Sequence, residues 1–248
     1  LGEMAAGIAH EVRNPLAAIS LYSRMLESDL AEARTTRNGD GDLLDDAADT
    51  AHRIGDVVRG LNGIVTDVLD FARELQPRSA VVDVRTLFTR AAEAQRPALD
   101  AARVSVRIDA GASMAIEVDA DLLQQALVNL IRNAAEAMSH GDGREPRTLT
   151  LAARECDGAV VLTVRDTGPG IADDSIDRIF HPFFTTRNTG TGLGLAIVHR
   201  IVDAHGGAIS VHNNGGAVFE LSLPGRPPDP SSDAAGEAVD AWQAECVL

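Results

Sequence analysis

The sequence contains no lysine, and all 22 of its basic residues are arginine. A P-loop nucleotide site and a Schiff-base catalytic site both depend on a lysine, so neither is open to this chain. Positive charge is also outweighed, because 37 acidic residues bring the formal net charge to -15. This balance argues against general nucleic-acid binding, which needs a cationic surface. Any nucleotide site must therefore supply its own local positive charge.

Cysteines are few, and long hydrophobic runs are absent. Cys156 and Cys246 are far apart and make no metal or redox spacing, which favours a reducing compartment. No apolar run approaches the roughly 18 residues of a membrane span, and no secretory signal is present. We therefore expect a cytoplasmic location for these 248 residues, which suffice for one large domain or two of ordinary size.

The first part of the chain predicts two helices, at about 1–33 and 43–75, separated by turn-forming residues. Apolar residues in the second helix alternate three and four apart, as in a coiled-coil seam. Gly55, Gly60 and Gly63 each cost about 1 kcal/mol there and lower its expected regularity. Two helices with one seam each form an antiparallel hairpin that cannot bury itself. We expect two copies to pair into a four-helix bundle, which makes a homodimer.

His10 is the candidate nucleophile in the first helix. It lies about 200° around the helix from Ile8 and Val12 of the buried stripe, so it should face solvent. Glu11 beside it can hold the imidazole in one tautomer and leave the other nitrogen nucleophilic. Pro15 lacks an amide hydrogen and should bend the helix next to His10. A lone exposed histidine is usually an ordinary surface residue, so this assignment depends on the rest of the chain.

The remainder predicts an α/β sandwich and a tail, so the expected domains are 1–76, 77–224 and 225–248. The tail is rich in Pro, Asp, Ser and Ala, which predicts an acidic, disordered or weakly helical segment. The expected elements of the sandwich are a strand near 81–84, a helix at 85–99, strands near 104–108 and 115–118, a helix at 121–138, strands near 148–153 and 160–166, a helix at 193–205 and a closing hairpin near 209–223.

Two polar patterns in the sandwich point to a ligand. Asn129 and Asn133 share one face of a largely apolar helix, where side-chain amides need partners such as Mg²⁺ and phosphate oxygens. Asp166 ends a predicted strand, where a carboxylate can accept a hydrogen bond from an exocyclic amine such as that of adenine. Gly168 and Gly170 follow it and let a ligand approach the backbone. The second pattern also fits a simple turn, so neither is strong alone.

A glycine-rich run at 190–195 opens the last predicted helix, where free amides and the helix dipole favour phosphate. It lacks the lysine of a P-loop and is weak by itself. The segment before it, from about 172 to 191, carries Phe183 and Phe184. These rings are either plain core or part of a mobile lid.

In chain order these patterns resemble the N, first glycine, F and second glycine boxes of the gyrase-type ATPase fold as it occurs in histidine kinases. The phrase HEVRNPL at 10–16 resembles the phosphoacceptor box of bacterial sensor histidine kinases, particularly the nitrogen-regulation subgroup. The resemblance covers nearly the whole chain, from residue 1 to about 224. It implies an α+β fold in which a dimerising helical hairpin precedes an ATP-binding sandwich of the gyrase and histidine kinase type.

The resemblance implies a protein-histidine kinase that uses ATP and Mg²⁺. The γ-phosphate would pass to His10, with Glu11 orienting the imidazole and taking or sharing its proton. Asn133 would coordinate Mg²⁺, Asn129 would support it, and Asp166 would read adenine. The other residues expected around the nucleotide are Gly168, Gly170, Phe184, Arg187, Gly190, Gly192, Gly194 and Leu195. Arg187 stands where this subgroup commonly has a lysine, and it keeps a charge that can grip phosphate.

The resemblance also implies a partner, because a phosphohistidine would pass its phosphate to an aspartate of a response-regulator receiver domain. Asn14 either caps the bent turn before Pro15 or orients water toward the regulator's phosphoaspartate, which would add phosphatase activity. We expect the chain to be a cytoplasmic fragment whose sensor region, with or without an anchor in the inner membrane, is missing.

Two other classes share some of these features. A gyrase-type ATPase or a protein-serine kinase would share the nucleotide site but would not need the exposed box around His10. A non-catalytic dimerisation scaffold would not need intact asparagine, aspartate and glycine positions. Acid-labile, alkali-stable label after incubation with labelled ATP would separate all three.

Overall fold

The computed structural model describes residues 15–26, 28, 30, 41–111, 114–140, 146–156, 158–186 and 190–225. The chain forms two compact units, Leu1–Arg73 with Arg187–Thr191 and Glu74–Thr186 with Gly192–Leu248. Four predicted site residues, His10, Glu11, Asn14 and Arg187, lie outside the described residues. In the described part of the chain, no helix is both long enough and apolar enough to span a membrane.

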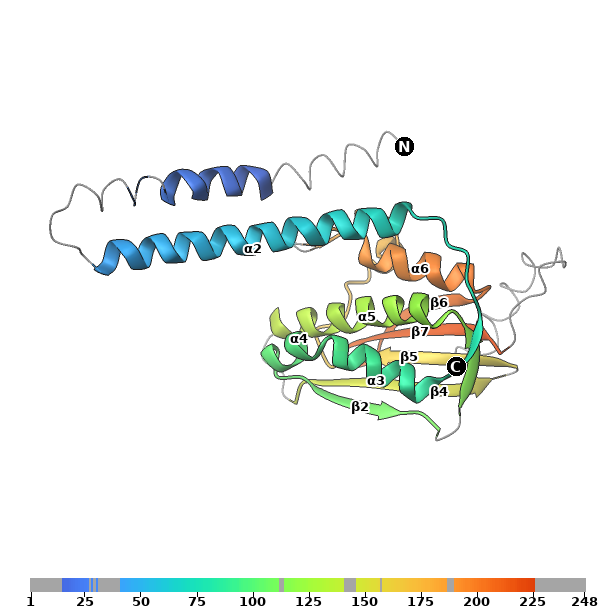
Figure 1. The fold of residues 1–248 in the computed structure, drawn as a ribbon. Coiled ribbons are helices and arrows are strands. Elements are labelled where there is room, and N and C mark those ends of the chain that lie inside the picture. The colour runs from blue at the N-terminus through green and yellow to red at the C-terminus, as the bar shows by residue number, and fades with distance from the viewer. Residues whose placement is uncertain are drawn as a thin grey trace. The chain divides into compact units, whose positions relative to one another are not determined.

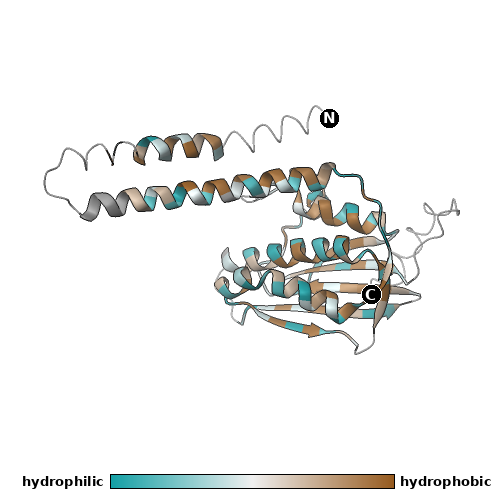
Figure 2. Cartoon of the chain, viewed as in Figure 1, coloured by the Kyte–Doolittle hydropathy of each residue, from teal (hydrophilic) through white to brown (hydrophobic). Residues whose placement is uncertain are grey.

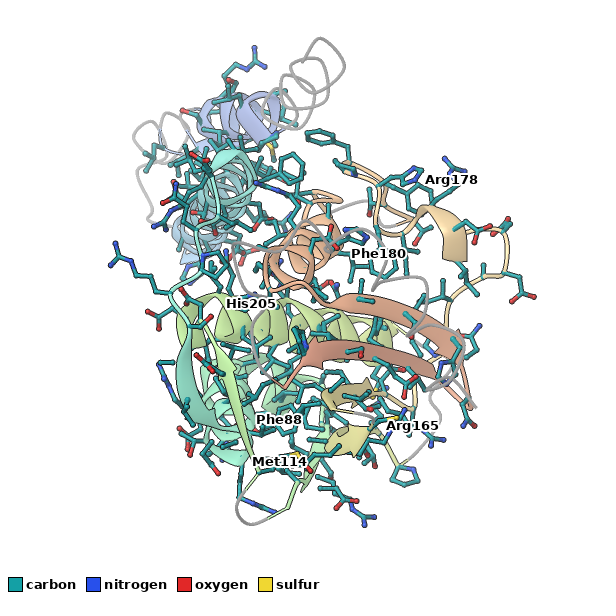
Figure 3. The ribbon with its side chains drawn as sticks, turned by 90° about the vertical axis from the view of Figure 1, so that its right-hand side faces the viewer. Phe88, Met114, Arg165, Arg178, Phe180 and His205 are labelled. Carbon is teal, nitrogen blue, oxygen red and sulfur yellow. The ribbon has the colours of Figure 1, made fainter. Side chains whose placement is uncertain are left out.

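The first unit is a helical hairpin. Residues 15–26 are helical and run antiparallel beside α2 (Gly41–Ala72), as Figures 1 and 3 show. α2 ends three residues before the expected end at Leu75, and its last turn closes where the Arg73 amide donates to the Leu69 carbonyl at 3.0 Å. Pro77 disfavours the helical conformation for Gln76, so the chain must leave the helix ahead of that residue.

The hairpin leaves large apolar side chains exposed. They are Leu16, Leu21, Met25, Leu30, Val58, Val65 and Leu69. In Figure 2, hydrophobic positions recur along α2 between hydrophilic ones, as the predicted seam requires. One hairpin cannot cover this apolar surface by itself, which favours pairing with a second copy.

The second unit is a mixed sheet with helices on one face (Figure 1). Its elements are β1 (Ala80–Asp83), α3 (Val84–Ala94), α4 (Arg96–Ala101), β2 (Ser105–Asp109), β3 (Ala115–Val118), α5 (Ala120–His140), β4 (Thr148–Cys156), β5 (Ala159–Arg165), η1 (Ile176–Arg178), α6 (Gly194–Ala204), β6 (Ala208–Asn213) and β7 (Ala217–Pro224). Five strands pair in the order β2-β4-β5-β7-β6, with β2 and β4 parallel and the other neighbours antiparallel. β1 and β3 form a separate antiparallel pair. The predicted α+β fold class is confirmed.

The single helix expected at 85–99 is wrong, because α3 ends at Ala94 and α4 begins at Arg96. Gln95 between them has φ -103° and ψ 10°, outside the helical range. Pro97 is the reason: it has no amide hydrogen to continue α3, but it fits the first turn of a new helix, where no such bond is needed.

α5 is the middle helix of the covering layer and packs against both α3 and α6. Leu127, Leu130 and Ile131, which the sequence assigns to the core, are at most 1% exposed. Below them β5 is the central strand of the sheet, and most of its residues are buried. Phe88 of α3 is fully buried in the same core (Figure 3). α5 is therefore held rigidly along its length.

The start of α5 is fixed by Asp119 and His205. The Asp119 carboxylate accepts hydrogen bonds from the amides of Leu122 at 3.1 Å and Arg78 at 2.8 Å, and a third from Asp121 at 3.1 Å. Its own amide donates to Nε2 of the buried His205 at 3.0 Å, whose Nδ1 lies 2.7 Å from the carbonyl of Ile201 in α6. Burial raises the pKa of Asp119, but the three amides outweigh it and hold the pKa below its usual value. The end of α6 and the beginning of α5 are thus joined.

Candidate functional site

Asn129 and Asn133 lie on α5 at the expected four-residue spacing. Asn129 is only 6% exposed, and Asn133 is partly buried. Nη2 of Arg132 donates to Oδ1 of Asn129 at 3.0 Å. A buried side-chain amide within an apolar helix thus has a cationic partner on the same helix.

Asp166 directly follows β5 and is 4% exposed. Its Oδ1 accepts hydrogen bonds from the amides of Gly168 at 2.8 Å and Ala217 at 3.1 Å, while its own amide donates to the Ala217 carbonyl at 3.0 Å. The carboxylate is therefore fixed in one orientation just after the C-terminal end of β5, where the sequence predicts it.

The loop after Asp166 is held between α5 and β6. A Cβ on Gly168 would lie 3.1 Å from Oδ1 of Asp166 and 3.4 Å from Cγ of Met138 in α5. Gly170 has φ +79°, and a Cβ there would lie 2.6 Å from Oδ1 of Asn213. Side chains of the protein thus lie close to both glycines, and the approach of a ligand to their backbone stays a prediction.

Two residues that hold this loop are absent from the sequence prediction. Asn213 binds both backbone groups of Ile171: its Oδ1 accepts from the amide at 2.9 Å, and its Nδ2 donates to the carbonyl at 2.7 Å. Gly216 lies so close to Asp166 that an added Cβ would be 2.1 Å from the Asp166 carbonyl oxygen. The only local signal was the pair of glycines before β7, which fits any hairpin turn.

The phenylalanine segment meets the glycine run. The Phe183 amide donates to the Gly192 carbonyl at 3.0 Å, and both residues have positive φ, +65° and +66°. The Arg178 guanidinium stacks 4.5 Å above the Phe184 ring. The ring of Phe180, which Figure 3 labels, lies 5.6 Å from the ring of His199 on α6. Phe184 is thus half-buried on a segment next to the site, and the mobility expected of a lid remains a prediction.

α6 begins at Gly194, directly beside the asparagine pair. A Cβ on Gly194 would lie 3.4 Å from Nη2 of Arg132 and 3.7 Å from Oδ1 of Asn129. The helix has no side-chain cap at Leu193 and no acidic residue in its first turn. Its first amides, including that of Leu195, carry the positive partial charge of a helix N-terminus beside α5. Gly190 follows the undescribed residues 187–189.

Both loops lie over one stretch of α5. A Cβ on Gly168 would meet Met138 and the backbone of Ala137, whereas a Cβ on Gly194 would meet Asn129 and Arg132. Asn129 and Ala137 are eight residues apart, which is about 12 Å along a helix axis. The stretch therefore has a buried carboxylate at one end and the N-terminal amides of α6 at the other. This arrangement suits an elongated ligand with a base at one end and phosphates at the other.

The candidate ligands for a metal ion at this site include the side-chain amides of α5. Among the described residues there is no group of three or more His, Cys, Asp or Glu side chains that could hold one. Asn129 and Asn133 both carry an amide oxygen of the kind that Mg²⁺ binds, and that of Asn129 accepts a hydrogen bond from Arg132. The role predicted for Asn133 thus fits the donor set.

Two family models match the chain. Residues 1–77 match the His Kinase A (phospho-acceptor) domain, and residues 118–227 match the histidine kinase-, DNA gyrase B- and HSP90-like ATPase domain. The sensor histidine kinase ZraS of Escherichia coli (strain K12) is 36% identical over 232 residues, which are 90% of this chain and 45% of ZraS. The chain therefore spans less than half of the length of this relative.

Solved structures show similar folds. Full-length ShkA in complex with AMPPNP has a TM-score of 0.61 and 29% identity, covering 90% of this chain and 45% of ShkA. Histidine kinase ThkA in complex with the response regulator protein TrrA has a TM-score of 0.68 and 25% identity, covering 92% of this chain and 62% of the other. Both similarities extend across the two units described above.

Proposed function

Because this chain belongs to the bacterial sensor histidine kinases of two-component systems, we propose that it transfers the γ-phosphate of ATP to His10. A response-regulator aspartate would then take the phosphate from His10. The observation that carries the proposal is the stretch of α5 between Asp166 and the start of α6, which matches the two ends of ATP. ShkA with AMPPNP and ThkA with TrrA support the choice of nucleotide and of partner.

Each residue has a role in binding or transfer. Asp166 would accept a hydrogen bond from the adenine amine, and the first amides of α6 would bind phosphate oxygens. Arg187 would add a guanidinium to the phosphates, and Phe184 would help cover them. Mg²⁺, when bound, would neutralise phosphate charge, with Asn133 as its protein ligand. The remaining site residues, which shape the loops, are Gly168, Gly170, Gly190, Gly192, Gly194 and Leu195.

The transfer itself needs one nucleophile and one proton acceptor. An unprotonated imidazole nitrogen of His10 attacks the γ-phosphorus, the bond from phosphorus to the bridging oxygen breaks, and ADP leaves with that bond's electrons. Glu11 orients the imidazole and takes or shares the proton of the other ring nitrogen. Positioning and charge neutralisation supply most of the rate enhancement.

The same proposal implies a dimer, a cellular location and a role for Asn14. Two hairpins would pair into a four-helix bundle, and the exposed apolar residues of α2 support this dimer. We place the catalytic core in the cytoplasm, with any inner-membrane anchor in a sensor region outside these residues. Asn14, on the face of His10, would orient water toward the regulator's phosphoaspartate and add a phosphatase activity.

Labelled ATP tests the proposal. The wild-type chain should gain label that is labile in acid and stable in alkali, as a phosphoramidate is. His10→Ala should lose the label but keep ATP binding, because His10 belongs to the first unit whereas Asn133 and Asp166 belong to the second. Asp166→Asn should lose both, whereas Asp109→Asn, at the exposed end of β2, should lose neither. Acid-stable label would indicate a serine kinase, and ATP hydrolysis without label would indicate a gyrase-type ATPase.

A further inference from the structure

Cys156, the last residue of β4, is disulfide-bonded in the structure. The chain has two cysteines, and the other is Cys246, which lies 90 residues further along the sequence and outside the described residues. Within one chain Cys246 is therefore the only available partner. Neither cysteine takes part in the phosphoryl transfer proposed above.

The sheet brings the start of the tail close to Cys156. Cys156 pairs with Ala159 of β5, and Ala159 in turn pairs with Pro224 at the end of β7. The Gly225 amide then donates to the Gly158 carbonyl at 2.9 Å, in the turn between β4 and β5. Neighbouring strands lie about 4.8 Å apart, so the chain leaves the sheet about 10 Å from Cys156.

The tail is long enough to return to Cys156. Cys246 follows Gly225 by 21 residues, and a flexible chain of that length has ends about 25 Å apart on average. A disulfide requires the two Cα atoms to lie about 6 Å apart. Because the tail starts so near, it presents the Cys246 thiol to Cys156 at an effective concentration on the order of millimolar.

Cys156 lies on the outer face of the sheet, opposite α3, α5 and α6. Leu149 and Leu151 of the same strand are fully buried on the face that these helices contact (Figure 1). Side chains alternate along a strand, so Cys156 belongs to the other face. Ala159 shares this outer face and is only 4% exposed, although its neighbours in the register are Cys156 and Pro224. A segment that follows Pro224 and bonds to Cys156 would cover it.

The charge of the outer face also suits the tail. Arg154 lies two residues before Cys156 on this face, 3.4 Å from Glu220, and its side chain is 45% exposed. The tail has five acidic residues and one arginine. Its charge is therefore complementary to that of Arg154.

We propose that Cys156 and Cys246 form a reversible disulfide that holds the tail against the outer face of the sheet. The two thiols lose two electrons and two protons as the S–S bond forms. A small-molecule disulfide such as oxidised glutathione takes them up through a mixed disulfide and leaves as two thiols. In a reducing compartment such a bond is a redox sensor rather than a permanent link. The tail is thus free in the reduced chain and held in the oxidised one.

The bond is remote from the proposed nucleotide site. Ala159 begins β5 and Asp166 directly follows its other end, so about 23 Å of strand separates them. Oxidation should therefore leave ATP affinity unchanged. The inference does not rest on the proposed function, because it involves neither ATP nor His10.

The first test uses Trp242, the one tryptophan of the chain, which lies four residues before Cys246. The full chain is oxidised with glutathione disulfide or reduced with dithiothreitol, and the fluorescence anisotropy of Trp242 is measured. Anisotropy should be higher after oxidation, because the tail is held. Cys156→Ser and Cys246→Ser should both keep the low value of the reduced wild type in either condition, and the control Ser232→Ala should respond as the wild type does.

The second test identifies the bond. Trypsin digestion without reduction, followed by mass spectrometry, should find the peptide 155–165 linked to the peptide 201–248. The melting temperature should rise by about 2–5 °C on oxidation, because the bond closes a loop of 90 residues in the unfolded chain but only the tail in the folded one.

Three outcomes would overturn the inference. Oxidised chains that migrate as a covalent dimer on a non-reducing gel would show that the cysteines join two copies. Two free thiols after incubation with glutathione disulfide would show that no bond forms. Equal anisotropy of the oxidised and reduced chains would show that the bond does not hold the tail.

Discussion

Glycines occur in both units for opposite reasons. A Cβ added to Gly60 or Gly63 of α2 would meet nothing within 4 Å. In the α/β unit, a Cβ on Gly192 would come within 2.5 Å of the Phe183 backbone, and one on Gly216 within 2.1 Å of the Asp166 carbonyl oxygen. The α2 glycines lower helix propensity without relieving a contact in the described hairpin, whereas the site glycines are imposed by backbones that meet.

The charged groups of the two units also differ, because an ion pair of α2 is exposed and Asp119 of the α/β unit is held by several hydrogen bonds. In α2, Arg53 and Asp49 form a 3.3 Å ion pair whose side chains are 61% and 71% exposed, and such pairs contribute little. In the α/β unit, Asp119 joins three amides from two segments and is itself bound to His205. The α/β unit thus fixes this carboxylate through its own backbone amides, whereas the ion pair of α2 is open to solvent.

Gly216→Ala should have the largest effect. It tests the glycines of the α/β unit, which lie against other backbone segments. We expect it to lower the free energy of unfolding of the α/β unit by about 3 kcal/mol or more, because the Asp166 backbone cannot retreat from its bonds to β7. Urea denaturation measures the change. Gly215→Ala is the control: φ is +71°, but the nearest contact is 3.9 Å away, so it should cost only about 1–2 kcal/mol of backbone strain. Equal losses would contradict the steric explanation.

Gly192→Ala should act on the ligand more than on the fold. The new methyl would push the backbone of Phe183 away from the start of α6, where phosphates are proposed to bind. We expect ATP affinity, measured by calorimetry, to fall about tenfold, with about 1–3 kcal/mol lost in stability. Gly206→Ala has a similar φ of +68° but lies beyond the other end of α6, so it should share the strain and keep ATP affinity. An equal loss of ATP binding in both variants would contradict the placement of the phosphates at the start of α6.

Acid should destabilise the α/β unit through Asp119. Burial raises its pKa, but the amides of Arg78, Leu122 and Asp121 lower it more, so the folded pKa lies below the unfolded one. Its stabilising contribution is therefore complete above the unfolded pKa and is lost as pH falls below about 4. Asp119→Asn should flatten the decline in unfolding free energy between about pH 4 and 2. An unchanged slope would show that other carboxylates cause the decline.

Gly60→Ala and Gly63→Ala should give the smallest effects. They test the glycines of α2, which have empty space around them. Each is expected to stabilise α2 by about 0.5–1 kcal/mol, because alanine has the higher helix propensity and the space is empty. Thermal melting and sedimentation of the full chain would measure stability and dimerisation. A fall in stability or in dimerisation would show that these glycines lie against a second copy, where a small residue lets helices approach closely.

Local patterns predicted on which elements several candidate site residues lie. The spacing of Leu127, Leu130 and Ile131 predicts the buried face of α5, and Asn129 and Asn133 follow from the same period. Asp166 was predicted at the end of its strand because Gly168 and Gly170 follow it. Pro97 could have shown the break between α3 and α4, since a proline this far inside a predicted helix cannot be accommodated.

The sequence by itself determined which residues share a helix face, which carboxylate ends a strand and which glycines open a helix, because each depends on neighbours a few positions away. Only the tertiary structure decided that Gly216 lies against Asp166, that Asn213 holds Ile171, and that Arg132 reaches the first residue of α6. Gly216 and Asp166 are 50 residues apart in the chain. They meet because β7, and not β6, pairs with β5, and no local pattern encodes that strand order.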